Sequence, residues 1–384
     1  MDRELLRAAD GVRGEPAARA TGWLSHERYF WHDTGTAAGF LEAGGWLEPL
    51  AHVESVATKR RFQNLLALSG LLGALVSLTP REATREELEA VHTPAYVERI
   101  EELSARRGGD AGDGTTPFGP GGAEIARLSA GGAIAAVDAV LTGAVRNAYA
   151  LVRPPGHHAL ADRGMGFCIF NNVAVAVRHA QSAHGVERVA VVDWDVHHGN
   201  GTQAAFYDDP AVLTISVHQD RCYPADSGAL DERGSGAGFG ANLNLPLPPG
   251  SGHEAYLDAF RRVVAPALER FSPQLVVVAC GFDASAFDSM GRMLLHSDSY
   301  RALTEILLTT TEGRLALIHE GGYSDFYVPF CGLAVVEALA GTRTAVEDPF
   351  LEDTKQMGGQ ELSDEQRRSV DAARALLADG SALW

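Results

Sequence analysis

Cysteine and long apolar runs are both scarce in this sequence, and their scarcity excludes several classes of protein. There are four cysteines, without C-x-x-C spacing, and a chain of 384 residues does not need disulfide cross-links to fold. We therefore expect reduced thiols at Cys168, Cys222, Cys280 and Cys331. No stretch of about 18 apolar residues occurs, so we expect no membrane span. The N-terminal text MDRELLRAADGVRGEP lacks the apolar segment of a signal peptide, which predicts a cytoplasmic protein.

Basic residues are also few relative to acidic residues. Lysine and arginine number 32 against 50 acidic residues, and the formal net charge is -18. A general nucleic-acid binder would present a basic face, so we expect no nucleic-acid partner. The negative charge is compatible with a cationic substrate and equally with solubility alone. A hydrophobic content of 46% in a chain of this length allows a large buried core.

Five short apolar runs alternate with segments of helical spacing. The runs lie at residues 148–152, 189–192, 212–217, 275–279 and 315–318. Helices are expected at residues 58–69, 85–90, 94–103, 123–141, 172–184, 254–271 and 299–311, with Pro266 interrupting the sixth. This pattern predicts an α/β fold with a mostly parallel central sheet and helices on both of its faces.

We expect one domain over residues 1–384, with a core at about residues 21–342 and a helical extension at about residues 343–384. In the extension, Ser363 and Gln366 have the spacing of a capping box that opens a helix ending near residue 378. The glycine-rich segment 108–122 predicts a long loop of the kind that is functional or disordered. The loop and the last helix are candidate subunit contacts in a homo-oligomer.

Each apolar run ends in a polar cluster. In chain order the clusters read RPPGHH, DWDVHHGN, HQD, GFD and HEGGY. In open α/β sheets the ligand-binding crevice lies at the carboxyl ends of the strands. The strand ends would therefore deliver histidine, aspartate and tyrosine side chains to one rim, which predicts an active site there.

Asp193, Asp195 and His197 alternate along the chain and would point to the same side of an extended segment. Two carboxylates and an imidazole so close together favour a bound cation, and Asp283 offers a further carboxylate from another strand. An Asp-x-His pair alone is more often a capping or salt-bridged pair. With the distant aspartate, however, three protein ligands would leave an open coordination position, which is typical of catalytic zinc.

The tandem histidines His157 and His158 follow a stiff Pro-Pro-Gly turn. They suit proton transfer because imidazole titrates near neutral pH. Tyr323 follows two glycines at a strand end, where a phenol can donate to a developing oxyanion opposite the metal. The alternatives are a surface histidine pair and a tyrosine that only packs at the rim.

Together these motifs resemble the histone deacetylase family, within the arginase/deacetylase fold. The matching text is RPPGHH at residues 153–158, GFCIFNN at 166–172, DWDVHHGNGTQ at 193–203, GFDAS at 281–285 and EGGY at 320–323. The order and separations also match, over about residues 21–342. The HHGNGTQ text looks like the class II branch and the bacterial histone deacetylase-like amidohydrolases.

The resemblance implies a zinc-dependent amidohydrolase that removes an acetyl or related acyl group from acyl-lysine or a similar N-acyl amine. By resemblance the zinc ligands are Asp195, His197 and Asp283. His157 and His158 divide the roles of general base and of electrostatic partner or leaving-group acid, with His158 favoured as the base.

The resemblance also assigns the residues around this centre. Asp193 is expected to orient His157, and Asn200 stands beside His158 where class I relatives carry aspartate. Tyr323 matches the family's catalytic tyrosine.

The resemblance further implies a structural potassium ion and an apolar substrate channel. The potassium site would use Asp193, Asp195, His197, Ser216 and Val217, and a second monovalent site would lie near Phe206, Asp209 and Val212. The substrate-binding candidates are Gly166, Phe167, Tyr223, Met290 and Gly321, with Asp110 or Asp113 at the rim.

Three competing interpretations stay open. An arginase-like enzyme would bind two manganese ions, but the sequence offers one complete ligand set. A protein that binds acyl groups without hydrolysing them would have the same fold. An acetylpolyamine or other small amide would change only the substrate, and fold membership alone does not choose.

Overall fold

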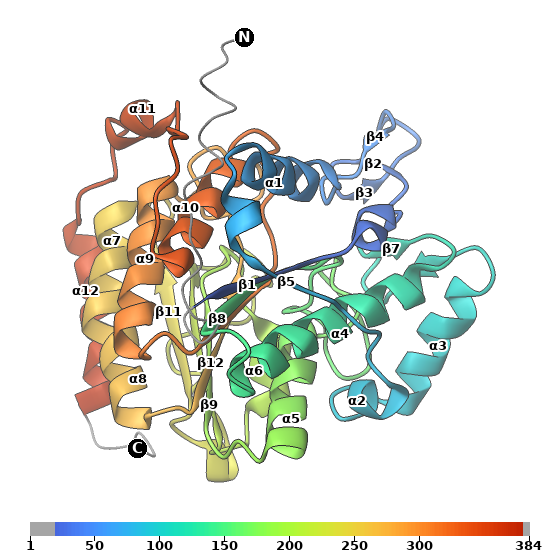
Figure 1. Ribbon diagram of the computed structural model, residues 1–384, viewed down its shortest axis with the longest axis horizontal. Helices are drawn as coiled ribbons and strands as arrows, with labels where there is room; N and C mark the ends of the chain where they lie inside the picture. The colour runs from blue at the N-terminus through green and yellow to red at the C-terminus, as the bar shows by residue number, and fades with distance from the viewer. Residues whose placement is uncertain (1–19, 379–384) are drawn as a thin grey trace.

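The computed structural model describes residues 20–378 and is built around one eight-stranded sheet (Figure 1). The strand order is β11-β10-β9-β12-β13-β8-β1-β5, and every neighbouring pair is parallel. The strands are β1 Thr21–Ser25, β5 Val76–Leu78, β8 Asn147–Leu151, β9 Val189–Asp193, β10 Val212–Gln219, β11 Asn242–Leu247, β12 Leu275–Cys280 and β13 Leu315–His319. The predicted α/β fold with a parallel sheet is confirmed, and the five predicted strands are β8, β9, β10, β12 and β13.

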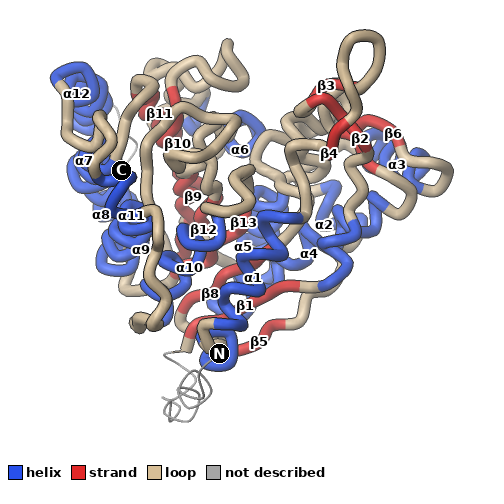
Figure 2. Tube along the Cα trace, turned by 90° about the horizontal axis from the view of Figure 1, so that it is seen from above, coloured by secondary structure: helices blue, strands red, loops and turns tan. Residues whose placement is uncertain are grey.

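Helices cover both faces of the sheet, as the alternating pattern predicted. On one face lie α4 and α5, and on the other lie α7 to α10 and α12 (Figures 1 and 2). The helices are α1 Ala57–Leu68, α2 Arg85–Glu89, α3 Pro94–Ser104, α4 Gly122–Leu141, α5 Asn172–His184, α6 Asn200–Phe206, α7 His253–Ala259, α8 Ala265–Phe271, α9 Ser297–Thr310, α10 Val328–Ala340, α11 Leu351–Lys355 and α12 Asp364–Ala378. Because both faces are covered, the central strands are buried along their whole length.

Two small antiparallel sheets lie outside the main one. The first joins β2 Thr36–Ala38, β3 Leu41–Glu42 and β4 Leu50–Ala51. The second joins β6 Gly109–Asp110 and β7 Pro117–Phe118 within the glycine-rich segment 108–122. That segment, predicted to be a loop, is therefore a short hairpin.

The expected break at Pro266 takes another form. A π-helical turn, Phe260–Val264, joins α7 to α8, and the proline lies in the first turn of α8. Proline has no amide hydrogen to donate to the carbonyl one turn earlier in an α-helix. The wider π-helical turn before Pro266 changes the hydrogen-bond pattern, so this donor is not needed there. The predicted interruption is thus a local change of helical pitch.

The C-terminal helix begins as its sequence predicted. The amide of Ser363 donates to Gln366 Oε1 at 2.8 Å, and the amide of Gln366 donates to Ser363 Oγ at 3.3 Å. This reciprocal pair is the capping box. Val370, Ala373 and Leu377 are buried, so α12 turns its apolar side toward its own chain.

Between residues 20 and 378, none of the helices combines the length and the apolar character needed to cross a bilayer. The N-terminal segment on which the prediction about a signal peptide rests lies outside the described residues.

Candidate active site

Four adjacent strands deliver the predicted site residues to one edge of the sheet. In spatial order these strands are β9, β12, β13 and β8. The residues that follow them are Asp195 and His197 after β9, Asp283 after β12, Tyr323 after β13, and His157 and His158 after β8. Since the strands are parallel, their carboxyl ends meet at the same edge, where ligand crevices of such sheets form.

Asp195, His197 and Asp283 form a buried group whose ligand atoms all lie within 4.8 Å of one another. His197 Nδ1 lies 3.0 Å from Asp195 Oδ1 and 3.2 Å from Asp283 Oδ2. The amides of His197 and Val196 donate to Asp195 Oδ1 and Asp283 Oδ1, at 3.0 and 2.8 Å. The turn after β9 therefore holds both carboxylates in place, and the structure brings together the three residues that the sequence singled out.

The charges of this group fit a divalent cation. Burial and the neighbouring charge of Asp195 raise the pKa of Asp283 to about 7. Apart from its 3.2 Å contact with His197 Nδ1, the buried Asp283 Oδ2 has no hydrogen-bond partner among residues 20–378. Two buried carboxylates are costly unless a cation compensates them. Two carboxylates and an imidazole are also a donor set that zinc accepts.

The tandem histidines stand beside this group with their ring centroids 4.0 Å apart. His157 Nδ1 lies 2.9 Å from Asp193 Oδ2, and His158 Nδ1 lies 2.7 Å from Asn200 Oδ1. Both contacts follow the sequence expectation. Because Asn200 Oδ1 accepts from Nδ1, a neutral His158 carries its proton there and offers Nε2 as the basic atom.

The two imidazoles differ in their electrostatic surroundings. Burial lowers the pKa of His157, but the carboxylates of Asp195 and Asp193 outweigh burial and raise that pKa to about 10. Burial and the charge of His157 hold the pKa of His158 well below its ordinary value. The pair therefore combines a charged imidazolium with a neutral imidazole.

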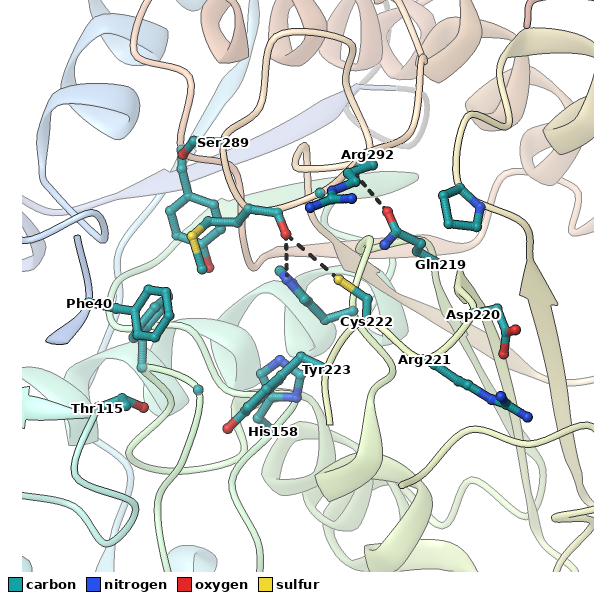
Figure 3. A pocket seen from close by; sticks show the side chains of 17 residues that line it. Phe40, Thr115, His158, Gln219, Asp220, Arg221, Cys222, Tyr223, Ser289 and Arg292 are labelled. Atoms are coloured by element: carbon teal, nitrogen blue, oxygen red, sulfur yellow. Dashed lines mark hydrogen bonds between the residues drawn. The ribbon is translucent and has the colours of Figure 1, made fainter. Parts of the chain in front are cut away.

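A cavity of about 550 Å³ opens beside His158, His197 and Tyr323 (Figure 3). Four of the predicted channel residues line it, namely Gly166, Phe167, Tyr223 and Met290. The Tyr223 ring stands perpendicular to His158 at 4.9 Å, and the Phe167 ring stands nearly perpendicular to Tyr323 at 5.7 Å. The rings of Tyr223 and Phe167 thus form parts of the cavity wall, next to His158 and Tyr323 respectively.

Gly321 lies against the two carboxylates. It was predicted to bind substrate, and its amide donates to Asp195 Oδ2 at 2.9 Å. A Cβ at this position would meet Asp283 Oδ2 at 2.2 Å and Asp195 Oδ2 at 2.6 Å. Close packing against the two carboxylates therefore requires glycine at this position.

Two acids that sequence reasoning did not assign position the site loops, the buried Glu320 and the half-buried Asp288. Glu320 Oε2 accepts the amides of Gly156 and His157 at 2.6 and 3.1 Å, which fixes the turn before the histidine pair. Asp288 Oδ2 accepts the amides of Tyr323 and Ser324 at 2.7 and 3.2 Å. Glu320 lies within the EGGY text, which was a usable signal, whereas no local pattern marks Asp288.

The two candidate rim aspartates have different roles. Asp110 accepts amides of its own hairpin, from Gly112, Gly114 and Thr116. Asp113 Oδ2 instead accepts the amide of Gly166 at 2.8 Å and lies 3.3 Å from the Tyr223 hydroxyl. The rim of the cavity is therefore tied to the hairpin through Asp113, which the sequence could not choose over Asp110.

The predicted monovalent sites differ in their surroundings. Asp193 and Ser216 line a cavity of about 10 Å³, which has room for roughly one water-sized particle. At the second site, Asp209 Oδ2 lies 2.5 Å from Arg178 Nη1, and the guanidinium lies over the Phe206 ring at 4.6 Å. A fixed positive charge thus already neutralises the Asp209 carboxylate.

Comparison with known proteins gives a consistent result. A model described as the histone deacetylase domain matches residues 52–339. The histone deacetylase-like amidohydrolase of Pseudomonas aeruginosa is 54% identical over 339 residues, which cover 86% of this chain and 89% of that protein. The probable deacetylase of Archaeoglobus fulgidus is 39% identical over 72% of this chain and 77% of its own length.

Two further matches extend the comparison: a relative that is named for one substrate class, and a solved structure. The human polyamine deacetylase HDAC10 is 41% identical over 76% of this chain, but the matched region is 45% of its own length. The crystal structure of the HDA15 HD domain matches with a TM-score of 0.80 at 33% identity, covering 93% of this chain and 95% of that one. The residues 52–339 that the histone deacetylase domain matches include every strand end that contributes to the site.

Proposed function

The chain belongs to the histone deacetylase family, and from this premise we propose that it is a zinc-dependent amidohydrolase. It removes acetyl or related acyl groups from the amine of acyl-lysine or a similar N-acyl amine. The observation that carries the proposal is the buried group of Asp195, His197 and Asp283 at a cavity that also exposes His158 and Tyr323. A single catalytic domain is proposed to contain the whole site.

We assign the zinc ion to Asp195, His197 and Asp283. When bound, zinc supplies a Lewis acid that polarises the acyl carbonyl and makes a bound water more acidic. Because two carboxylates already balance the charge of the ion, a separate base is needed for the water. The histidine pair supplies that base beside the metal group.

The protein's own groups divide the proton transfers and the charge stabilisation. His158 Nε2 takes a proton from the attacking water, and the Tyr323 hydroxyl donates to the carbonyl oxygen as negative charge develops. Burial and nearby carboxylates keep the pKa of Tyr323 well above its ordinary value, so the phenol stays a donor. A histidine of the pair then protonates the departing amine, and the products are a free amine and a carboxylate.

We also propose a structural potassium ion at the cavity lined by Asp193 and Ser216, with the backbone of Val217 nearby. The size of that cavity and the buried carboxylate support it. The second monovalent site, near Phe206 and Val212, is proposed to use backbone oxygens, because Arg178 already pairs with Asp209.

The charges at the cavity mouth favour acyl-lysine over an acylpolyamine. The exposed charged side chains that line the cavity are Arg221, Arg292 and Asp220 (Figure 3). The Asp113 carboxylate at the rim is committed to the Gly166 amide and the Tyr223 hydroxyl, so the two arginines outnumber the one exposed aspartate and oppose entry of a polycationic tail. An acylated lysine in a neutral or acidic peptide meets no such repulsion, so we propose this substrate class.

For the cellular compartment, we propose the cytoplasm. All four cysteines are free thiols, which favours a reducing compartment such as the cytoplasm.

For a homo-oligomer, the supporting surface is the small sheet of β2, β3 and β4 with its connecting loop, where Trp46 is fully exposed and Leu50 is 65% exposed. Neither the C-terminal helix nor segment 108–122 offers a comparable apolar face.

The experiment that tests the proposal compares turnover on four substrates: acetyl-lysine peptide, trifluoroacetyl-lysine peptide, acetylputrescine and acetylspermidine. The expected result is zinc-dependent turnover of the peptides that exceeds turnover of the two polyamines. A zinc chelator should abolish it, and added zinc should restore it. Binding of the acyl substrates without any release of acid would instead support a ligand-binding protein, and two manganese ions per chain would support an arginase-like enzyme.

A further inference from the structure

A second group of histidine and carboxylate side chains lies on the surface between α4 and α5, which pack side by side (Figure 1). Asp138 comes from the last turn of α4, and His179 and His184 come from the end of α5. Both helices end where the chain returns to the amino ends of β8 and β9. The group therefore lies at the edge of the sheet opposite the active site.

The three side chains converge on one point. His179 Nε2 lies 2.8 Å from Asp138 Oδ1, and His184 Nε2 lies 2.7 Å from the same oxygen. Their ligand atoms all lie within 4.8 Å of one another. The side chains of His179, His184 and Asp138 are 13%, 25% and 34% exposed, so an ion can reach them from solvent.

The second nitrogen of His179 is already committed. Its Nδ1 lies 3.0 Å from Glu87 Oε1, and Glu87 is held by Arg81 and by the amide of Thr84. When Nδ1 donates to Glu87, the Nε2 lone pair of His179 is left to bind an ion beside Asp138 Oδ1. A histidine whose other nitrogen donates to a fixed carboxylate is also the usual arrangement of a metal-bound histidine.

We propose that Asp138, His179 and His184 bind a divalent transition-metal ion of the zinc type, at a site separate from the catalytic group. Two imidazoles and a carboxylate suit such an ion, and three protein ligands leave room for water. Metal–ligand bonds of about 2.0–2.1 Å place ligand atoms roughly 3.3 Å apart. The side chains reach this spacing by opening slightly from their present contacts, which partly exposed groups can do.

The bound ion would join α4 to α5 and, through Glu87, to the first turns of α2. An ion that binds only the folded chain stabilises it by mass action. At a free metal concentration about a hundred times Kd, this effect raises the Tm of a protein of this size by about 3 °C. The site therefore acts as a metal-dependent clip on one face of the sheet.

The test uses zinc-loaded protein from which excess metal has been removed, titrated with Ni²⁺ alone by calorimetry. The expected result is one Ni²⁺ per chain, while the zinc content stays at one per chain by elemental analysis. His184→Ala and Asp138→Asn should each weaken Ni²⁺ binding at least about ten-fold and remove the rise in Tm. Ser182→Ala, an exposed change on the same turn of α5, is the matched control and should bind as the wild type does.

Two outcomes would overturn the proposal. If the wild type binds no Ni²⁺, then the group is a hydrogen-bonded network without a metal ion. If Ni²⁺ binds equally to the wild type and to both variants, then the ion lies elsewhere. Neither result bears on the catalytic zinc, whose content is measured separately.

Discussion

The chain holds two groups built from the same side-chain types, and they differ in burial. Asp195, His197 and Asp283 are almost inaccessible, with exposures of 0%, 5% and 0%. In the surface group, His179, His184 and Asp138 keep 13% to 34% of their side chains exposed. Water can therefore screen the surface charges, but it cannot screen the buried ones.

This difference decides what each group requires of a metal ion. In the buried group, burial and the charge of Asp195 raise the pKa of Asp283 to about 7. Ionising both carboxylates without a cation is therefore unfavourable. A divalent cation removes that penalty. In the surface group the three side chains are partly exposed, so water can solvate them when no ion is bound. We therefore propose that the first group requires a metal ion and that the second group accepts one.

The largest expected effect comes from removing one buried ligand. Asp283→Ala should lose the catalytic zinc and lower kcat/KM by more than about 100-fold. Losing a residue that only hydrogen-bonds to a metal ligand lowers activity by up to about 100-fold, and loss of a ligand itself should cost more. The measurements are zinc per chain and turnover of an acetyl-lysine peptide. Asp231→Ala, which removes an exposed aspartate, is the control and should retain both. Full activity in Asp283→Ala would remove this residue from the metal site.

The next effect separates charge stabilisation from metal binding. Tyr323→Phe keeps the ring that packs near Phe167 and removes the hydroxyl. Loss of one oxyanion donor typically lowers kcat by about 100-fold or more, so turnover should fall by that factor. Zinc content should stay at one per chain. Turnover equal to the wild type would show that the hydroxyl has no part in the reaction.

Much of the fold followed from continuous apolar runs, and the strands without such runs were missed. β11 reads NLNLPL, an alternating pattern with Pro246, and it lies at one edge of the sheet. Proline and alternation are both typical of edge strands, so a search for two-residue periodicity would have found it. β1 and β5 are short and contain glycine or serine, and only their pairing with β8 and with each other identifies them.

The site was predictable where residues stand close to strand ends, and unpredictable where contacts depend on tertiary packing. Asp195, His197 and Asp283 follow directly from sequence text and topology. Asp288 could not be assigned, because its role lies in contacts with amides of a distant loop. The surface group was also missed: histidines five residues apart on a helix do not share a face, and they meet only through an aspartate on another helix.

An intermediate effect should appear in the pH dependence of the buried site. Asn200→Asp would place a carboxylate 2.7 Å from His158 Nδ1 if the geometry of the amide is kept. A neighbouring negative charge favours the imidazolium and therefore raises the pKa of His158. A protonated His158 cannot accept a proton from water, so the acidic limb of kcat/KM should move to higher pH. His184→Ala serves as the comparison and should leave the profile where it is, and an unmoved profile in Asn200→Asp would argue against His158 as the base.

The smallest expected effect is on the stability of metal-free protein, to which the surface group should contribute little. In metal-free protein, His184→Ala removes one partly exposed contact with Asp138, which should change the free energy of unfolding by no more than about 0.5 kcal/mol. Denaturant unfolding with and without a chelator measures this. The variant and the wild type should differ clearly only when Ni²⁺ is present. A loss of several kcal/mol without metal would mean that His184 supports the fold directly, and the contrast between a metal-requiring group and a metal-accepting group would then fail.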